Sequence, residues 1–365
     1  MLEPLAGAAR LALSSLLLVA LGCDGDPAEG TDASSPADAG SEPGADAATD
    51  AGPTTSGARP WLYVVNTNDD LTSFAAANTA DGPVTPRTSQ PLGAATGLFQ
   101  PRAIAITTSG RLLVGRQNGG IIGWDSLASA DGETPRDREV TDGSLSTVVA
   151  FGYDASADRL YVGVPMAASG VLVYDDVSGA AFDGALAPSR AFGPPDRAPH
   201  ATSGSLRMSV DAFAFDATGA LYVVDTSGAN TNHSRVLVFD APGTADGETT
   251  PARIFESDVW NGLADIAIDG AGNLLAVDDT GTIYVVPSVA SATGSVTPQT
   301  IAVSPERANL AGILVGADGT VYVSDRQNAD LYVFDALVGG TGAPSRTIGG
   351  TPTGLRGPRH MFLVE

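Results

Sequence analysis

Few side chains in this sequence could carry chemistry, and most of those that could are carboxylates and arginines. The chain has 365 residues with 42 acids, 19 bases and a formal net charge of −23. All of the bases are arginine, because the sequence contains no lysine. This composition excludes a Walker-type phosphate loop and a Schiff-base enzyme, which need lysine. The acidity also disfavours binding to nucleic acid or to anionic lipid.

Histidine and cysteine are scarce as well. The three histidines, His200, His233 and His360, are too few for a histidine-rich metal site, and a lone cysteine, Cys23, can form neither an internal disulfide nor a thiolate cluster. We find no Gly-x-Ser-x-Gly elbow, no His-Glu-x-x-His motif and no Rossmann glycine fingerprint. His360, which directly follows Arg359, is the one candidate for a catalytic base.

Several charged residues recur at a fixed interval along the chain. One set of acids is Asp225, Asp278 and Asp325, a second is Asp125, Asp175, Asp240 and Asp335, and a set of arginines is Arg190, Arg253 and Arg346. Because recurrence at one repeat position favours a structural role, we interpret the acids as turn caps. We expect the arginines to protect strand edges or to pair with acids of neighbouring repeats.

The repeating unit contains four short β-type runs in about 50 residues. The first run recurs six times with a mean spacing near 52 residues, and its copies begin at Leu62, Leu112, Leu160, Leu221, Leu274 and Val321. No helix-length amphipathic pattern competes with these runs. Each repeat therefore predicts one four-stranded sheet, which cannot bury both of its faces alone.

Six such sheets packed around an axis form a closed array with protected edges. The sequence thus predicts an all-β fold, a six-bladed β-propeller of four-stranded antiparallel blades over residues 59–365. The first repeat, beginning at Trp61, lacks an innermost strand, whereas the C-terminal run from His360 to Val364 has no repeat after it. We expect these two segments to pair, so that the C-terminal strand closes the ring.

The pattern Asp-x-x-Gly-x-Leu-Tyr-Val-x-Asp, found from Asp216 to Asp225, and the strand from Val236 to Asp240 resemble NHL repeats. The resemblance to this six-bladed group implies a ligand site where the inner strands begin. Residues near those starts, or in loops on the same face, are Arg102, Asn118, Asp211, Asp265, Arg359 and His360. These six are our candidates for the ligand-binding face of the channel.

Gluconolactonase- and paraoxonase-like propellers, which this fold also resembles, hold a catalytic calcium in the channel with Glu, Asn and Asp. That resemblance implies a Ca²⁺ site at Asp211 and Asp265 with Asp278 or Asn118, and His360 as the base; carboxylate and amide oxygens suit calcium. The expected inner-channel glutamate is missing from this sequence.

The N-terminal residues predict a signal peptide followed by a linker. Residues 1–22 contain an apolar run, Leu11 to Leu21, that is too short to span a bilayer and is typical of a signal peptide. The segment Ala20-Leu21-Gly22-Cys23 resembles the lipobox of bacterial lipoproteins, which implies lipidation of Cys23; an ordinary secretory signal is the alternative. Residues 23–58 carry eight acids, no base and no Leu, Ile, Val or aromatic residue, which predicts a disordered linker.

Three functions fit this sequence. We favour a lipid-anchored protein of a bacterial cell envelope, on the periplasmic or outer-membrane side, whose propeller binds a ligand or protein without catalysis. The alternative is a Ca²⁺-dependent lactonase or esterase, and the third is a structural role for the acidic surface. We expect a monomeric domain whose partner is a small ligand or an envelope protein. We expect no binding to nucleic acid, and contact with the membrane through the lipid alone. We expect no cofactor unless calcium is bound.

Overall fold

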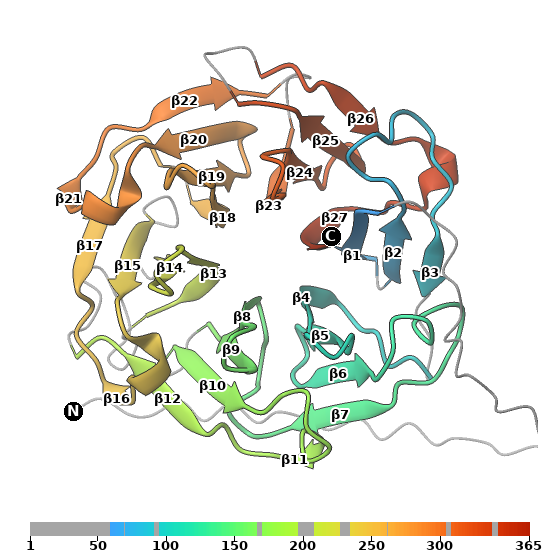
Figure 1. Cartoon of the computed structure of the whole chain (residues 1–365), viewed down its shortest axis with the longest axis horizontal. Coiled ribbons are helices and arrows are strands. Elements are labelled where there is room, and N and C mark those ends of the chain that lie inside the picture. The colour runs from blue at the N-terminus through green and yellow to red at the C-terminus, as the bar shows by residue number, and fades with distance from the viewer. Residues whose placement is uncertain are drawn as a thin grey trace, which may run out of the picture. The chain divides into compact units, whose positions relative to one another are not determined.

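Six sheets arranged around a central axis make up the described part of the chain. The structure, a computed structural model, describes residues 59–68, 70–90, 95–165, 170–195, 208–226, 234–260, 262–303, 308–337 and 342–365. The predicted signal peptide, the linker and Cys23 lie outside these residues, as do His200 and His233. Figure 1 looks down the axis and shows the innermost strands of the six blades facing one another.

The first three blades contain the following strands, given from the axis outward. Blade 1 is β27 (Pro358–Val364), β1 (Trp61–Asn66), β2 (Asp70–Phe74) and β3 (Thr88–Gln90); blade 2 is β4 (Pro101–Ile106), β5 (Leu112–Arg116), β6 (Ile121–Trp124) and β7 (Arg138–Thr141); blade 3 is β8 (Ala150–Asp154), β9 (Arg159–Gly163), β10 (Val171–Asp175) and β12 (Arg190–Gly193). All neighbours within these sets pair antiparallel.

The other three blades follow the same plan. Blade 4 is β13 (Val210–Phe215), β14 (Leu221–Asp225), β15 (Arg235–Phe239) and β17 (Arg253–Glu256); blade 5 is β18 (Leu263–Ile268), β19 (Leu274–Asp278), β20 (Thr282–Val286) and β22 (Gln299–Ala302); blade 6 is β23 (Leu310–Val315), β24 (Val321–Asp325), β25 (Asp330–Phe334) and β26 (Arg346–Ile348). Three short 3₁₀ turns, η1 (Pro242–Thr244), η2 (Val289–Ser291) and η3 (Thr351–Thr353), lie in the connections. The described residues contain no helix with the length and apolarity to cross a membrane.

The core lies between adjacent blades. The second strand of blade 4, β14, is buried along its whole length because a neighbouring blade packs against each of its faces. Tyr222 of this strand belongs to a cluster shared with Ile266 and Leu274 of blade 5, whereas Val223 belongs to a cluster shared with Tyr161 of blade 3. Strands buried on both faces explain why the recurring Leu-Tyr-Val runs are almost entirely apolar.

The ring closes by pairing the two ends of the propeller, which confirms the prediction from the sequence. Strand β27 pairs antiparallel with β1, with Leu62 opposite Leu363, Tyr63 opposite Phe362 and Val64 opposite Met361. Figure 1 shows the C-terminal strand beside the first strand at the centre of the ring. The fold class is therefore an all-β, six-bladed propeller.

The structure contains contacts between adjacent blades around the outer rim, which were not predicted from the sequence. In each blade the connection between the third and fourth strands reaches the outermost strand of the preceding blade. Three of these segments form short fifth strands, β11 (Gly184–Ala185) on β7, β16 (Gly247–Glu248) on β12 and β21 (Gly294–Ser295) on β17; the other three contacts are Gly82 with Ile348, Gly132 with Ser89 and Gly342 with Val303. These rim contacts cover the outer sheet edges, which would otherwise expose unpaired backbone groups.

Recurring arginines and acids pair within one blade. Arg138, Arg190, Arg253 and Arg346 form ion pairs with Asp125, Asp175, Asp240 and Asp335 respectively. Our expectation of pairing with acids of neighbouring repeats was therefore wrong. The outer strand pairs antiparallel with the third strand of its own blade, and that register places each arginine beside its own blade's acid.

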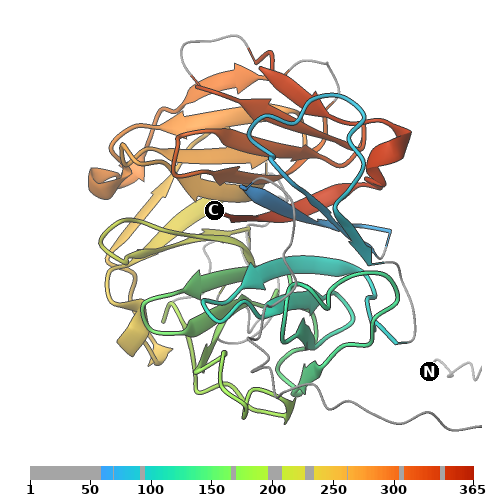
Figure 2. The same cartoon turned by 45° about the vertical axis from the view of Figure 1, so that its right-hand side comes forward.

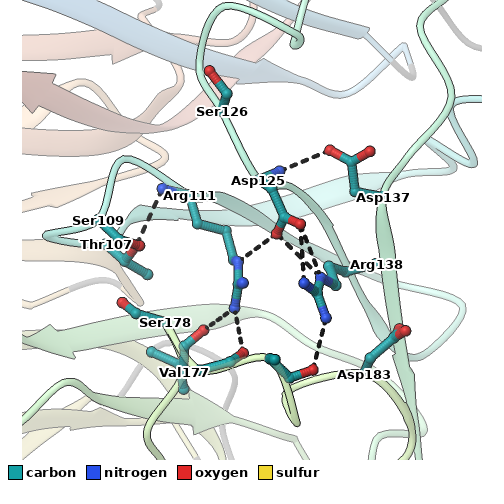
Figure 3. Close-up of polar contacts among 12 residues, drawn as sticks. Thr107, Ser109, Arg111, Asp125, Ser126, Asp137, Arg138, Val177, Ser178 and Asp183 are labelled. Atoms are coloured by element: carbon teal, nitrogen blue, oxygen red, sulfur yellow. Dashed lines mark hydrogen bonds and ion pairs between the residues drawn. The ribbon is translucent and has the colours of Figure 1, made fainter. Parts of the chain in front are cut away.

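Two arginines of blade 2 contact the next blade through backbone carbonyls. In blade 2, Arg111 and Arg138 both bind the carboxylate of Asp125, with N–O distances of 2.8 and 3.0 Å. Figure 3 shows the two guanidinium groups continuing into blade 3, where Arg111 donates to the carbonyl of Val177 and Arg138 to that of Ala180. The two arginines thus link neighbouring blades without needing an acid on the second one.

Candidate functional site

The candidate site is the mouth of the central channel on the face where the inner strands begin. At least one residue near the start of each inner strand borders a cavity of about 450 Å³ there. We call one such residue from each strand the inner ring; going around the axis these six are Arg359, Arg102, Val149, Asp211, Ala264 and Ala311. Figure 2, a tilted view, shows the dark red C-terminal strand that carries Arg359 beside the blue first strand.

A break in strand register accompanies most inner-ring positions. The pairing of β4 with β5 shifts between Pro101 and Ala103, which leaves Arg102 out of the ladder. The same shift leaves out Asp211 in β13, Ala264 in β18 and Ala311 in β23. In β27 two residues, Arg359 and His360, lie opposite Val65 alone. Because a bulge redirects a side chain away from the regular alternation, the charged side chains of Arg102, Asp211 and Arg359 can point towards the channel.

A second circle of side chains, which we call the outer ring, follows the ends of the second strands. Its members, which come from blades 1, 2, 4, 5 and 6, are Thr67, Gln117, Thr226, Asp279 and Arg326. In three blades the outer-ring residue bonds the inner-ring residue of the same blade. Arg102 donates to Oε1 of Gln117 at 2.6 and 2.9 Å, Arg359 donates to Oγ1 of Thr67 at 3.1 Å, and the hydroxyl of Thr226 donates to Asp211.

Three guanidinium groups, those of Arg102, Arg326 and Arg359, line this cavity together. Burial, together with the positive charges of Arg102 and Arg326, lowers the pKa of Arg359 to about 9. Burial also lowers the pKa of Arg102, against the opposing effect of Asp211. None of the three forms an ion pair with the residues that the structure describes. The mouth is therefore locally cationic in a strongly acidic protein.

His360 borders this cavity, and Asp265 lies beside His360. Nδ1 of His360 is 3.8 Å from Oδ2 of Asp265, and the two side chains are 17% and 10% exposed. Burial raises the pKa of Asp265 to about 7, against two backbone N–H groups, those of Ile313 and Ile266, that donate to its oxygens at 2.9 Å. Burial and the nearby Arg359 and Arg102 lower the pKa of His360 to about 3.

Further along the inner strands, most side chains that line the channel are apolar. A second cavity of about 270 Å³ is bordered by Asp265 and His360 on one side and by side chains that include Phe151, Phe213 and Phe362. His360 lines both cavities. The channel thus combines a charged mouth, a buried acid and imidazole, and an aromatic interior.

The structure brings together most of the candidates predicted from sequence. Arg102, Asp211, Arg359 and His360 border the first cavity, and Asp265 lies beside His360 and borders the second. Asn118 is exposed in the turn after β5 and does not border either cavity. Asp278 is fully buried, and its oxygens accept bonds from Thr280, Thr282 and the hydroxyl of Tyr284.

The residues predicted to hold calcium do not fit such a site in this arrangement. The oxygens of Asp278 and Asp265 already accept hydrogen bonds within the fold, and one oxygen of Asp211 accepts the hydroxyl of Thr226. Among the described residues, no group of three or more His, Cys, Asp or Glu side chains is placed to bind a metal ion. We therefore derive no step through a metal.

Sequence reasoning missed Arg326, although the signal was present. Arg326 directly follows the recurring Asp325, just as Thr226 follows Asp225 and Asp279 follows Asp278. Aligning the repeats one position beyond that aspartate would have found the outer ring. Asp278 and Asp325 cap turns as we predicted: Asp325, for example, accepts from the backbone N–H groups of Gln327 and Asn328.

Comparisons with known proteins support the architecture alone. No protein-family model matches this chain, and a search of curated proteins finds no significant match. A chain in the crystal structure of a nidogen/laminin complex superposes with a TM-score of 0.54 at 11% identity, covering 84% of this chain and 99% of that one.

Two further solved structures resemble the chain more weakly. The β-propeller domain of Cps50 (Swd1) from Myceliophteria thermophila has a TM-score of 0.49 at 14% identity and covers 80% of this chain and 83% of that one. Virginiamycin B lyase from Staphylococcus aureus has a TM-score of 0.43 at 12% identity, covering 71% of this chain and 73% of that one. The likeness to the chain of the nidogen/laminin complex supports the propeller fold of this chain and nothing finer about its function.

Proposed function

We propose that this protein is a binding module whose propeller takes an anionic group into the channel mouth, and that a lipid on Cys23 tethers it to a bacterial cell envelope. The observation that carries the binding proposal is the cluster of Arg102, Arg326 and Arg359 around one cavity, without an ion-pair partner among the described residues. Guanidinium groups are well suited to carboxylate and phosphate, which they bind through paired hydrogen bonds.

The surroundings of the cluster strengthen this proposal. The chain from Arg59 onward carries 33 acids and 18 arginines, so its net charge is −15. Holding three guanidinium groups together in a partly buried site costs free energy, as the lowered pKa values of Arg359 and Arg102 indicate. An anion bound between them would relieve that repulsion, and the partial exclusion of water would strengthen the attraction.

Calorimetric titration of the mature protein with inorganic phosphate and with succinate tests the proposal. We expect binding of at least one of these anions and a loss of affinity of about tenfold or more in Arg326→Gln, because a hydrogen bond to a charged group is removed. Arg356→Gln is the matched control, since Arg356 is exposed in the same region and does not border the cavity. Absence of binding by both anions, or equal losses in the two variants, would refute the proposal.

The tether requires a separate test. Lipidation predicts that the protein fractionates with membranes, that the N-terminal peptide carries acyl groups on Cys23, and that Cys23→Ala releases it to the soluble fraction. A membrane-bound Cys23→Ala variant would contradict this part and leave the binding proposal untouched.

The Ca²⁺-dependent lactonase or esterase stays a prediction from sequence. It requires a bound metal, a melting temperature that falls in EDTA, and hydrolysis of lactones or aryl esters. Elemental mass spectrometry of the purified protein and an ester screen test these requirements. A stoichiometric metal together with turnover would refute the proposal of a binding module and support the enzyme.

A further inference from the structure

The two rings at the channel mouth are paired unevenly around the axis. In blades 1, 2 and 4 an inner-ring residue is hydrogen-bonded to the outer-ring residue of the same blade. In blades 5 and 6 the inner-ring residues are Ala264 and Ala311, whose methyl groups cannot form such a bond. The outer-ring residues of these two blades, Asp279 and Arg326, therefore have no inner-ring partner.

This uneven pairing leaves both room and charge on one side of the mouth. The small side chains of Ala264 and Ala311 border the cavity where the other blades place longer groups. Asp279 is exposed, and no hydrogen bond or ion pair of its carboxylate with another described residue is present. The guanidinium of Arg326 likewise has no ion pair within the described part of the chain, so the two opposite charges line one cavity without neutralising each other.

Asp279 is also the acid of this cavity that is available to a ligand. The other acid at the mouth, Asp211, accepts the hydroxyl of Thr226 and is attracted by Arg102, so it is already engaged. Burial raises the pKa of Asp211, against these two contacts. A cationic group entering the cavity would therefore meet the carboxylate of Asp279 first, while an anionic group would meet Arg326, Arg359 and Arg102.

We propose that the cavity binds a small zwitterion, with a carboxylate of the ligand at Arg326 and Arg359 and an ammonium group at Asp279. This inference rests on the proposed anion site and adds a cation subsite beside it. The chemical class is an amino acid or the backbone of a short peptide, since both carry an ammonium and a carboxylate. A cavity of about 450 Å³ has room for either.

Calorimetry of the mature protein with four probes separates these contributions: L-alanine, N-acetyl-L-alanine, L-alanine amide and L-alanyl-L-alanine. N-acetylation removes the ammonium charge and amidation removes the carboxylate. We expect L-alanine or the dipeptide to bind about tenfold more tightly than both monofunctional probes, because each lost charge removes one charge-assisted hydrogen bond. Tighter binding of the amino acid or of the dipeptide identifies which of the two sources fits the cavity.

Variants assign the effect to the two residues. In Asp279→Asn the ratio of the affinities for the preferred zwitterion and for N-acetyl-L-alanine should collapse to near one, whereas in Arg326→Gln both affinities should fall. Asp258→Asn is the matched control, because Asp258 is an exposed acid that does not border the cavity, and it should keep the wild-type ratio.

The outcomes distinguish this inference from the function on which it rests. If N-acetyl-L-alanine binds as tightly as L-alanine and the dipeptide, the zwitterion inference is overturned while anion binding stands. If Asp279→Asn keeps the wild-type ratio of the affinities for the preferred zwitterion and for N-acetyl-L-alanine, Asp279 does not bind the ammonium group, and the inference is overturned by this result too. If neither these carboxylates nor phosphate or succinate bind, the anion site itself fails.

Discussion

Asp265 and His360 form a buried pair in which the pKa of the carboxyl lies above that of the imidazole, the reverse of their order in the unfolded chain. Burial raises the pKa of Asp265 from 3.8 to about 7 and lowers that of His360 from 6.5 to about 3. At pH 5 the folded protein therefore holds one proton on the carboxyl, whereas the unfolded chain holds one on the imidazole. Since both states bind the same number of protons, this pair contributes almost no pH dependence to stability between about pH 4 and 6.5.

Removing one partner should reveal how the other makes the unfolding free energy depend on pH, and the two dependences should have opposite signs. In His360→Gln only Asp265 remains, and its raised folded pKa stabilises the fold at low pH, so the unfolding free energy should fall as pH rises from 4.5 to 6.5. In Asp265→Asn only His360 remains, and its lowered folded pKa means that the unfolding free energy should rise over the same interval. Each slope, relative to wild type, should approach about 1.4 kcal/mol per pH unit.

Urea denaturation of wild type and both variants at pH 4.5, 5.5 and 6.5 measures these slopes. The comparison with wild type cancels the contribution of the other acids, and a uniform loss of stability at all three pH values does not affect it. Parallel curves for the three proteins would mean that neither group is shifted in the folded state.

At the scale of elements, the rim contacts join neighbouring blades where the outer strands would otherwise be free. Oδ1 of Asp183 accepts the backbone N–H of Glu139 in the preceding blade at 2.9 Å, and Asp131 and Asp81 make the same contact with Ser89 and Thr347. The glycine that follows each of these acids has a positive φ, 68° at Gly184, which an L side chain rarely adopts. The Asp-Gly pair is thus a turn and a blade connector at once.

Asp183→Ala should lower the unfolding free energy by about 0.5–1 kcal/mol, because it leaves the N–H of Glu139 without this acceptor. That bond is the main reason why the pKa of Asp183 lies below its ordinary value, so the stabilisation is present at neutral pH and fades as pH falls through the folded pKa. Asp246→Ala is the matched control, since Asp246 occupies the same position but bonds the N–H of its own Gly247. Thermal melting at pH 7 checks the difference; equal shifts in the two variants would show that the contact between blades adds nothing.

The elements show what the sequence could and could not reveal. The blades were predictable because each strand signal is local, an apolar run of four or five residues between turns. The rim contacts were not, because they pair segments of different blades in parallel, and two residues such as Gly184 and Ala185 carry no strand signal of their own. The channel residues lie between these cases: Arg102 and Asp211 follow from their position near the start of a strand, whereas Arg326 needs the register of the whole repeat.

At the scale of the whole molecule, the chain enters the propeller on the face opposite the channel mouth. Trp61, the first residue of β1, pairs with Val364 at the end of β27, whereas Arg359 at the mouth is near the start of β27. Arg59 donates to the backbone carbonyl of the C-terminal Glu365 on that same opposite face. The described chain therefore reaches its first strand on the face away from the arginine-lined cavity.

Closure of the ring depends on the last strand of the chain. Deleting Met361–Glu365 removes the pairing of Met361, Phe362 and Leu363 with β1 and the apolar contacts that these three side chains make with neighbouring blades. Each such side chain contributes about 1–2 kcal/mol when it is partly buried, and the backbone bonds add to this, so we expect a loss of about 4 kcal/mol or more.

Differential scanning calorimetry tests this expectation, with a predicted fall in Tm of about 10 °C. The deletion opens the sheet of blade 1 and exposes β1 on its inner edge, so the effect should reach all six blades and not only the first. Deletion of residues 24–52, which lie outside the propeller strands, is the control and should leave Tm unchanged. An unchanged Tm after loss of the C-terminal strand would mean that contacts between blades, including those at the rim, hold the ring shut without it.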